Sequence, residues 1–285
     1  MKCLLCPNNC NVNRNEKMGY CESSYNFKIA KYSPFFYEEP LVSGTRGSGA
    51  IFFTGCSLKC KFCQNYSLSR NLRGKEISHE EFKRIIDELV SLGVHNVNLV
   101  NPTHYVKELD DFFSKNKISV PVVYNSHGYE KIESLLLAER FVDVYLVDLK
   151  YFLPNRSLRY CGKENYFEYA SKAILEMVKQ KPLIIENGII KQGVIVRHLI
   201  LPQNTDESLN LIKWYCDNVG DKAYLSVMSQ YTPFGDIDSL PELKRPITDR
   251  ERNKVHDFLF SCNLKNVFIQ EKQSSTTFYI PDWNY

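Results

Sequence analysis

Three cysteines are the residues of this sequence whose spacing most clearly indicates chemistry. Cys56, Cys60 and Cys63 form a Cys-x3-Cys-x2-Cys motif within one short segment. Three thiolates on one loop can ligate three irons of a cubane [4Fe-4S] cluster, which leaves the fourth iron open, as a catalytic metal site requires. A structural zinc loop would need a fourth ligand and a different spacing, and three metal-free core thiols are the other alternative. We therefore predict a catalytic iron–sulfur cluster here.

Four more cysteines, Cys3, Cys6, Cys10 and Cys21, fall within the first 21 residues. A segment with so few apolar residues cannot bury enough surface to fold alone, so we predict that a metal holds it together. An auxiliary iron–sulfur cluster and a structural zinc both use four thiolates, and both alternatives stay open, with the Cys6-Pro7 pair favouring iron–sulfur.

Composition limits the class of protein. The 285 residues are 44% hydrophobic and 24% charged, enough for a folded domain with a small appendage. A net charge of +3 is too small to indicate nucleic acid as a partner, and no apolar run reaches the roughly 18 residues needed to cross a bilayer. The first residues lack a secretory signal, so we expect a soluble, cytoplasmic protein whose clustered thiols mark metal sites rather than disulfides.

From residue 50 onward, strand-like and helix-like segments alternate. The strand candidates are rich in β-branched and aromatic residues without clean alternation, which is typical of parallel strands covered on both faces. They are 50–54, 94–100, 120–125, 142–149, 193–201, 222–228 and 266–270. Capping boxes at Ser78-x-x-Glu81 and Thr248-x-x-Glu251 begin two of the intervening helices. The predicted fold is α/β: a partial (β/α)6-type barrel over 50–285, preceded by a Cys-rich lobe and connector over 1–49.

Chemistry in such folds gathers at the carboxyl ends of the parallel strands, so residues there are candidate site residues. The candidates are Asn101, Pro102 and Thr103 after the second strand, Asn125 and Ser126 after the third, Asp148 and Lys150 after the fourth, and Arg197 and His198 inside the fifth. Asp148 and Lys150 are two residues apart and should share a face, either as ligand-binding groups or as a buried ion pair. Thr103 as a helix N-cap and His198 as a core histidine are the structural alternatives.

The cysteine motif, with the aromatic Phe62 before its last cysteine, resembles the signature of the radical S-adenosylmethionine (SAM) superfamily. The stretch 39–49 and Cys63-Gln64-Asn65 are similar to the branch related to pyruvate formate-lyase activating enzyme, and segments at 101–104, 124–129, 145–151 and 197–202 extend the resemblance along the whole chain. It implies that SAM chelates the open iron through its amino and carboxylate groups. One electron from the cluster then breaks the sulfonium C–S bond, which gives methionine and a 5′-deoxyadenosyl radical.

The same resemblance implies SAM contacts at the strand ends. Residues 101–103 stand where a Gly-Gly-Glu-like turn of the superfamily meets the SAM amino group, although Asn-Pro replaces the glycines here. Residues 125–126 and 148–150 would hold the carboxylate and ribose region, partly through a bound monovalent cation in the activating enzymes, where Asp stands in place of Asn125. Residues 197–198 would contact the adenosine side.

The function that the resemblance implies is hydrogen abstraction from a protein or peptide, with activation of a glycyl radical enzyme as the model reaction and a flavodoxin or ferredoxin as electron donor. An incomplete barrel suits this reaction because a lateral opening admits a peptide loop. One alternative is a radical SAM enzyme that modifies a ribosomal peptide or a small metabolite. An alternative of another class is a non-catalytic iron–sulfur electron-transfer protein.

Overall fold

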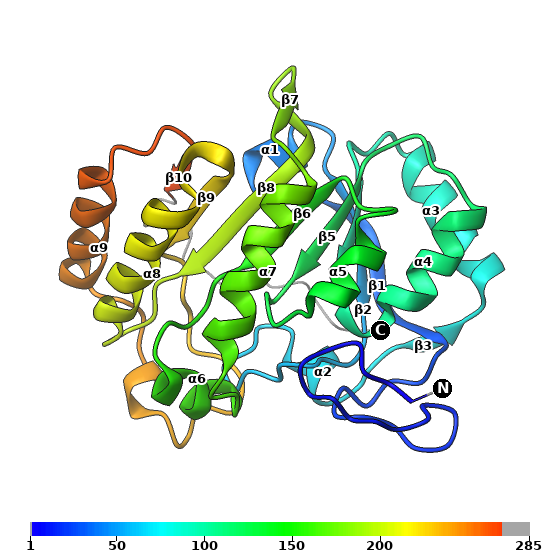
Figure 1. Ribbon diagram of the computed structural model, residues 1–285, viewed down its shortest axis with the longest axis horizontal. Helices are drawn as coiled ribbons and strands as arrows, with labels where there is room; N and C mark the ends of the chain where they lie inside the picture. Colours follow the sequence, from blue (N-terminus) through cyan, green and yellow to red (C-terminus); the bar gives the residue numbers. More distant parts are fainter. Residues whose placement is uncertain (1, 270–285) are drawn as a thin grey trace.

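A single, largely parallel sheet forms the centre of the computed structural model, which describes residues 2–269. The strand order is β10–β9–β8–β6–β5–β4–β2–β1–β3, and β7 pairs with β8 off this path (Figure 1). Seven strands, from β2 to β10 along this order, run parallel to their neighbours. The strands are β1 Phe27–Phe35, β2 Ser48–Phe53, β3 Lys75–Ile77, β4 Val97–Val100, β5 Val122–Ser126, β6 Val144–Asp148, β7 Ile184–Glu186, β8 Ile189–Leu199, β9 Tyr224–Met228 and β10 Val267–Ile269.

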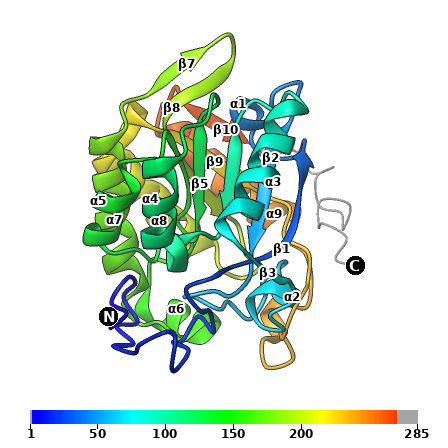
Figure 2. The same ribbon diagram turned by 90° about the vertical axis from the view of Figure 1, so that its right-hand side faces the viewer.

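Helices connect the parallel strands, and Figure 2 shows α4, α5 and α7 together on one side of the sheet. The helices are α1 Pro40–Ser43, α2 Tyr66–Ser69, α3 His79–Ser91, α4 Val106–Lys115, α5 Ile132–Ala138, α6 Pro154–Cys161, α7 Tyr166–Gln180, α8 Thr205–Asn218 and α9 Asp249–Ser261. Ser78 caps α3 by accepting a hydrogen bond from the Glu81 backbone, and a complete capping box between Thr248 and Glu251 begins α9. Both predicted helix starts are therefore confirmed.

Alternate residues of each strand face opposite sides of the sheet, and this places the core. On β6, Tyr145 and Val147 pack with the α7 residues Ile174 and Met177. Val144 and Leu146 face the other way and pack with α1, through Val42, and with Ile195 of β8. The face that carries Val144 and Leu146 is therefore filled by apolar side chains toward the amino ends of the strands. The polar residues that follow on this face lie at the carboxyl ends.

The α/β prediction with a partial, mostly parallel sheet is confirmed, and no closed barrel forms within residues 2–269. Within the stretch predicted as lobe and connector, residues 27–35 form β1 and pair antiparallel with β2. Pro34 in this stretch argues against a central strand, whereas a strand near the edge of the sheet accommodates it. Residue 270 of the last strand candidate lies outside the described residues, and the division into lobe and barrel stays a prediction. None of the helices in residues 2–269 is long and apolar enough to span a membrane.

Candidate active site

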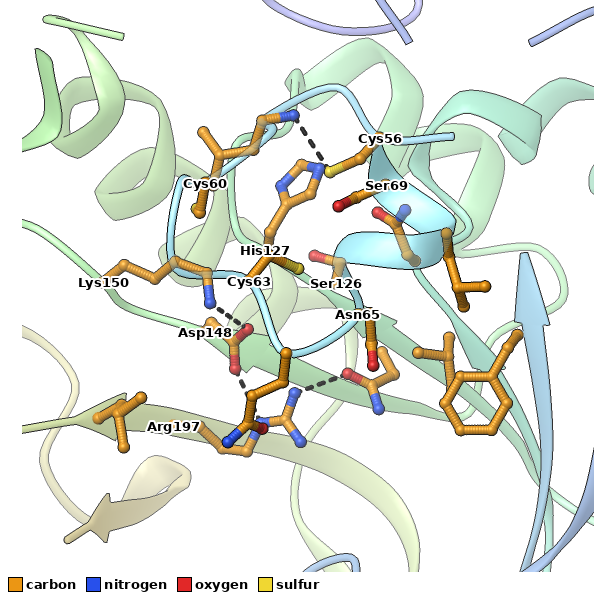
Figure 3. Close-up of a pocket in the computed structure, with 18 of the residues that line it drawn as sticks. Cys56, Cys60, Cys63, Asn65, Ser69, Ser126, His127, Asp148, Lys150 and Arg197 are labelled. Atoms are coloured by element: carbon orange, nitrogen blue, oxygen red, sulfur yellow. Dashed lines mark hydrogen bonds and ion pairs between the residues drawn. The ribbon is translucent and has the colours of Figure 1, made fainter. Parts of the chain in front are cut away.

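A cavity of about 270 Å³ opens at the carboxyl ends of the parallel strands. Its walls come from the β1–α1 connection, the loop after β2, and the ends of β4, β5, β6, β8 and β9. Cys56, Cys60 and Cys63 all line it, as the sequence predicts. Figure 3 shows the three cysteines on their loop, with Asp148 and Arg197 on the strands beneath them. The segments that carry the predicted chemistry are thus brought to one place.

The loop after β2 holds the cysteines in a compact conformation. Gly55, at φ +90°, makes the turn out of the strand, and Cys56 and Cys60 are buried. The Sγ of Cys56 accepts backbone N–H bonds from Leu58 and Lys59, each at 3.4 Å. Burial raises the pKa of the Cys56 thiol to about 12. A metal bound at this sulfur would supply the positive charge that favours the thiolate.

Cys60 has two neighbours that the sequence did not reveal. The Tyr151 hydroxyl donates to the Cys60 Sγ at 3.5 Å, and the Cys161 thiol lies within hydrogen-bonding reach of it. Cys161 ends α6 and is 4% exposed, and of the described residues the cavity lining includes the motif cysteines but not Cys161. It therefore lies behind Cys60 and does not occupy a fourth position inside the cavity.

Three thiols on one loop are a ligand set that an iron–sulfur cluster can use. Within residues 2–269, no three Cys, His, Asp or Glu side chains gather closely enough to hold one metal ion. A cubane cluster is bound at its corners by thiolates that surround it, and three cysteines lining one cavity match that requirement.

Arg197 is the centre of a polar network across the cavity from the cysteines. It donates to Asp148 at 2.8 Å, to Glu38 at 3.0 Å and to Asn125 at 2.7 Å, and Lys150 pairs with Asp148 at 2.7 Å. Burial alone would raise the pKa of Asp148, but Arg197 and Lys150 outweigh it and hold this pKa below its usual value. The structure therefore brings together Asn125, Asp148, Lys150 and Arg197, as predicted.

Glu38 is the network member that sequence reasoning missed. It precedes α1 and accepts hydrogen bonds from Asn98 at 3.0 Å and Asn125 at 3.1 Å, besides its pair with Arg197. Burial raises its pKa to about 7, even though Arg197 opposes the rise. Its neighbour Glu39 also lines the cavity, and only the Glu39-Pro40 pair in the sequence pointed to this segment.

The predicted residues after β4 separate into two groups. Asn101, at φ +60°, lines the cavity and donates from its side chain to the Gly55 carbonyl at 2.5 Å, so it ties the end of β4 to the cysteine loop. Pro102 and Thr103 are not among the described residues that line the cavity. The Thr103 hydroxyl instead donates to the buried Glu130 at 2.6 Å. Thr103 is the first residue of the short 3-10 helix Thr103–Tyr105, whose N-cap position is Pro102, so Thr103 is not an N-cap either.

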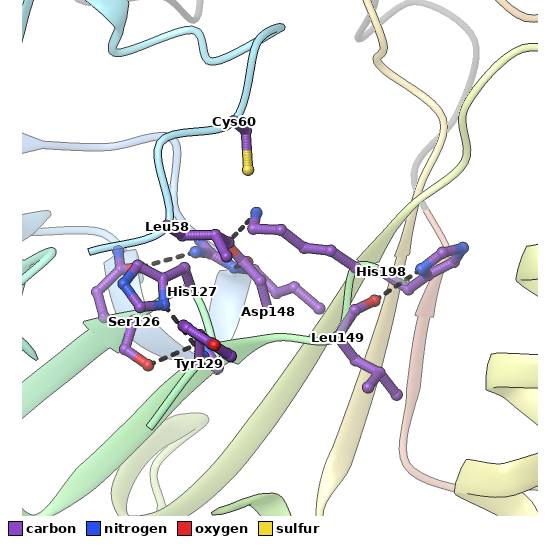
Figure 4. A network of polar contacts seen from close by, with 12 residues as sticks. Leu58, Cys60, Ser126, His127, Tyr129, Asp148, Leu149 and His198 are labelled. Carbon is purple, nitrogen blue, oxygen red and sulfur yellow. Dashed lines mark hydrogen bonds and ion pairs between the residues drawn. The ribbon is translucent and has the colours of Figure 1, made fainter. Parts of the chain in front are cut away.

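His198 points away from the cavity, contrary to the predicted cofactor contact. Its Nδ1 lies 2.8 Å from the Leu149 carbonyl (Figure 4). Its Nε2 lies 2.8 Å from the Ser208 hydroxyl of α8. The reason is the alternation of side chains along a strand: Arg197 faces inward, so the next residue must face the helices. His198 is thus the core histidine of the structural alternative.

Phe62 and Ser126 lie where the sequence predicts. Both line the cavity, and Phe62 packs edge-on against Tyr160 and Tyr231 with ring centroids 6.0 and 5.9 Å apart. His127, the residue after Ser126, also lines the cavity and makes a 2.7 Å contact with Ser57 of the cysteine loop. The four amino-terminal cysteines lie outside the cavity, and no disulfide joins them.

Comparisons with known proteins agree with this geometry. The chain is 29% identical over 274 residues to the uncharacterized protein MJ0674 of Methanocaldococcus jannaschii, a match that covers 93% of this chain and 76% of the relative. It is 27% identical over 184 residues to the pyruvate formate-lyase-activating enzyme of Clostridium pasteurianum, which covers 61% of this chain and 70% of that enzyme.

Solved structures match the fold at low sequence identity. Methylornithine synthase (PylB) superposes with a TM-score of 0.53 at 15% identity over 78% of this chain and 63% of its own. Streptococcus suis SuiB, bound to its precursor peptide SuiA, superposes with a TM-score of 0.51 at 14% identity over 76% of this chain, and the chain spans only 46% of SuiB. The profile of the radical SAM superfamily matches residues 50–215, which include the cysteine loop and the strands from β4 to β8. The chain therefore belongs to the radical SAM superfamily.

Proposed function

We propose that this protein abstracts a hydrogen atom from a protein or peptide substrate, in the manner of the activating enzymes of glycyl radical enzymes. The observation that carries the proposal is one cavity lined both by the three cysteines and by the Arg197 network. Membership of the family implies a [4Fe-4S] cluster and SAM, which together supply a 5′-deoxyadenosyl radical when bound. The similarity to the clostridial activating enzyme supports the choice of reaction.

The residues present fit these two groups. Cys56, Cys60 and Cys63 would hold the cluster, and the N–H bonds to Cys56 Sγ favour the thiolate form. The Oδ1 of Asn101 is buried at the cavity wall and has no hydrogen-bond partner among residues 2–269. A buried acceptor of this kind requires a donor, and the ammonium group of SAM is one.

The chain's own side chains would orient the ligand and exclude water. The pairs of Arg197 and Lys150 with Asp148 keep these three side chains in fixed positions, so they are ordered before any ligand arrives. Phe62, Tyr160 and Tyr231 form an apolar wall beside the cysteines, which lowers the local dielectric and keeps solvent from a reactive radical.

A polypeptide substrate is supported by the openness of the sheet. The strand order ends at β10 on one side and at β3 on the other, so no strand closes the cavity laterally within residues 2–269. Phe35 and Tyr37 on one side and Gln230 and Thr232 on the other form part of the lining. We further propose a reduced flavodoxin or ferredoxin as the one-electron donor.

The test uses anaerobically reconstituted protein with dithionite, SAM and a candidate glycyl radical enzyme deuterated at glycine. We expect 5′-deoxyadenosine that carries deuterium and a glycyl radical signal by electron paramagnetic resonance (EPR). Replacing Cys60 by Ala should abolish both, while Cys262→Ala, a thiol at the end of α9, should leave both unchanged. Deuterium transfer from a small metabolite or a ribosomal peptide, but not from the enzyme, would refute the activase assignment. Absence of 5′-deoxyadenosine under all conditions would support the electron-transfer alternative.

A further inference from the structure

The amino-terminal lobe, residues 2–24, folds without an apolar core. It contains no helix or strand, and its buried residues are Cys6, Pro7, Arg14, Cys21 and Ser23. Leu4 and Met18 are 51% and 55% exposed, while Leu5 is partly buried against the main core and not against other residues of a lobe core. Hydrophobic burial therefore cannot account for the order of this segment, and two of its five buried residues are cysteines with free thiols.

The backbone of the lobe turns so that its cysteines approach one another. Hydrogen bonds from Cys3 N to Val12 O and from Asn11 N to Cys3 O, at 2.8 and 2.9 Å, close the first turn. A Cβ at Gly19 would lie 3.1 Å from the Cys10 Sγ, so the chain before Cys21 passes directly over that sulfur.

Two of the four sulfurs accept hydrogen bonds from the lobe. Tyr20 N donates to the Cys10 Sγ at 3.2 Å, and the Asn8 side chain donates to the Cys6 Sγ at 3.5 Å. For Cys6 the donor is two residues further along the chain, as Leu58 is for Cys56 in the cysteine loop of the active site. Donors of this kind stabilise a thiolate.

The lobe also contacts the cysteine loop on both sides of Cys56. The Asn8 side chain donates to the Ser57 carbonyl at 2.7 Å, the Ser23 hydroxyl donates to the Thr54 carbonyl at 3.3 Å, and Glu22 forms an ion pair with the buried Lys59. Figures 1 and 2 both show the lobe, in dark blue, at the same end of the sheet as α2 and α6. The order of the lobe and the position of the catalytic loop are therefore linked.

We propose that Cys3, Cys6, Cys10 and Cys21 bind a second metal centre through four thiolates, and that the lobe so formed braces the loop of the catalytic cysteines. The centre takes a thiophilic metal, as a single zinc ion or as an iron–sulfur cluster. Because the sulfurs do not meet at one point within residues 2–269, the lobe either contracts around a single ion or surrounds a larger cluster. This site lies outside the catalytic cavity, so the inference does not depend on the substrate.

The first test measures metal in the full chain with Cys56, Cys60 and Cys63 all changed to Ala, reconstituted anaerobically with iron and sulfide or with Zn²⁺ alone. We expect this variant to retain about one zinc or about four irons per chain, and the element found identifies the centre. Adding Cys6→Ala and Cys21→Ala should remove this metal, whereas Cys216→Ala, a thiol of α8, should not. A folded triple variant that binds neither metal would overturn the proposal. If the triple variant fails to fold, equal metal content in the native chain and in Cys6→Ala/Cys21→Ala would also overturn it.

The second test concerns the bracing role and leaves every cysteine in place. Glu22→Gln removes the ion pair between the lobe and Lys59 of the cysteine loop. We expect unchanged metal content, but loss of the SAM-perturbed EPR signal of the catalytic cluster at least fivefold faster in the presence of a chelator. Lys83→Met, which removes an exposed ion pair of α3, is the control. A decay rate equal to that of the unmodified protein would refute the bracing role without touching the metal assignment.

Discussion

Glu130 is a buried carboxyl shortly after β5, and its pKa gives a quantitative prediction. Its side chain is 1% exposed and its Oε1 accepts the Thr103 hydroxyl at 2.6 Å, while its Oε2 has no hydrogen-bond partner among residues 2–269. Burial raises the pKa of this carboxyl from an ordinary value of 4.5 to about 7, and the hydrogen bond from Thr103 offsets only part of the rise.

The sign of the effect on stability follows from the two protonation equilibria. Below pH 4.5 the carboxyl is protonated in the folded and unfolded chains alike, so it adds no pH dependence. Between pH 4.5 and about 7 the unfolded chain loses this proton first, and the folded state therefore becomes less stable as the pH rises. The full separation corresponds to about 3 kcal/mol, because one pKa unit is worth ~1.4 kcal/mol. Other buried groups such as Glu38 also titrate, so only a difference between variants isolates Glu130.

The assay compares the thermal midpoints of anaerobic apoprotein and of Glu130→Gln between pH 5 and pH 8. Glutamine keeps the shape and stays neutral, so the variant should gain on the parent by several degrees as the pH rises. Glu133→Gln, an exposed residue in the first turn of α5, is the matched control and should parallel the parent. Identical pH profiles for Glu130→Gln and the parent would show that Glu130 is ionised in the folded protein at pH 5, and the reasoning would fail.

Three further predictions concern the site. Arg197→Met should destabilise the fold by about 3–5 kcal/mol, because it leaves Asp148 buried without its partner. It should also weaken SAM binding at least tenfold, and an unchanged dissociation constant in equilibrium dialysis would contradict the proposed site. His198→Phe should lower the free energy of unfolding by about 2 kcal/mol, because it removes two hydrogen bonds, and should leave SAM affinity within twofold. Unchanged thermal stability with weaker SAM binding in dialysis would instead indicate that His198 contacts the cofactor. Gly55→Ala should lower the free energy of unfolding by more than ~2 kcal/mol and speed proteolysis of the lobe, because the new Cβ would lie 2.2 Å from the Ser23 Oγ. Gly188→Ala is the control, since a Cβ there meets no atom within 4 Å. Equal digestion rates for the two variants would refute this prediction.

The parts of the site that the sequence predicts are those set by short-range spacing or by strand order. Cys56, Cys60 and Cys63 lie on one loop, so their spacing alone indicates a common ligand. Asp148 and Lys150 are two residues apart at the end of a strand, and the pleat puts them on one face. Parallel strands present their carboxyl ends at a common edge, which explains why residues as distant as Asn125 and Arg197 could be predicted together.

The parts that could not be predicted depend on contacts that no local pattern encodes. Glu38 pairs with Arg197 across 159 residues, and it reaches the cavity because β1 adds to the sheet beside β2. The error at His198 has another origin. The strand was predicted correctly, but both faces of it are covered by apolar residues. The sequence therefore does not reveal which alternate set of side chains, the one with Arg197 or the one with His198, points into the cavity. Thr103 was misplaced because its buried partner Glu130 lies on a different segment.

The charges in the cavity bear on whether the Arg197 network is a site or only a structural ion pair. Burying ions costs free energy that their mutual attraction rarely exceeds, so a purely structural network is expected to satisfy all of its own polar atoms. The five members Glu38, Asn125, Asp148, Lys150 and Arg197 meet that expectation, since none of their buried side-chain atoms lacks a partner among residues 2–269. Two residues beside them do not: Glu39 and Asn101 line the same cavity, and each carries one buried oxygen with no hydrogen-bond partner in the described part of the chain. A buried acceptor needs a donor. A structural ion-pair network gives no reason for two acceptors that lack one, whereas the ammonium group of the proposed SAM ligand would supply it.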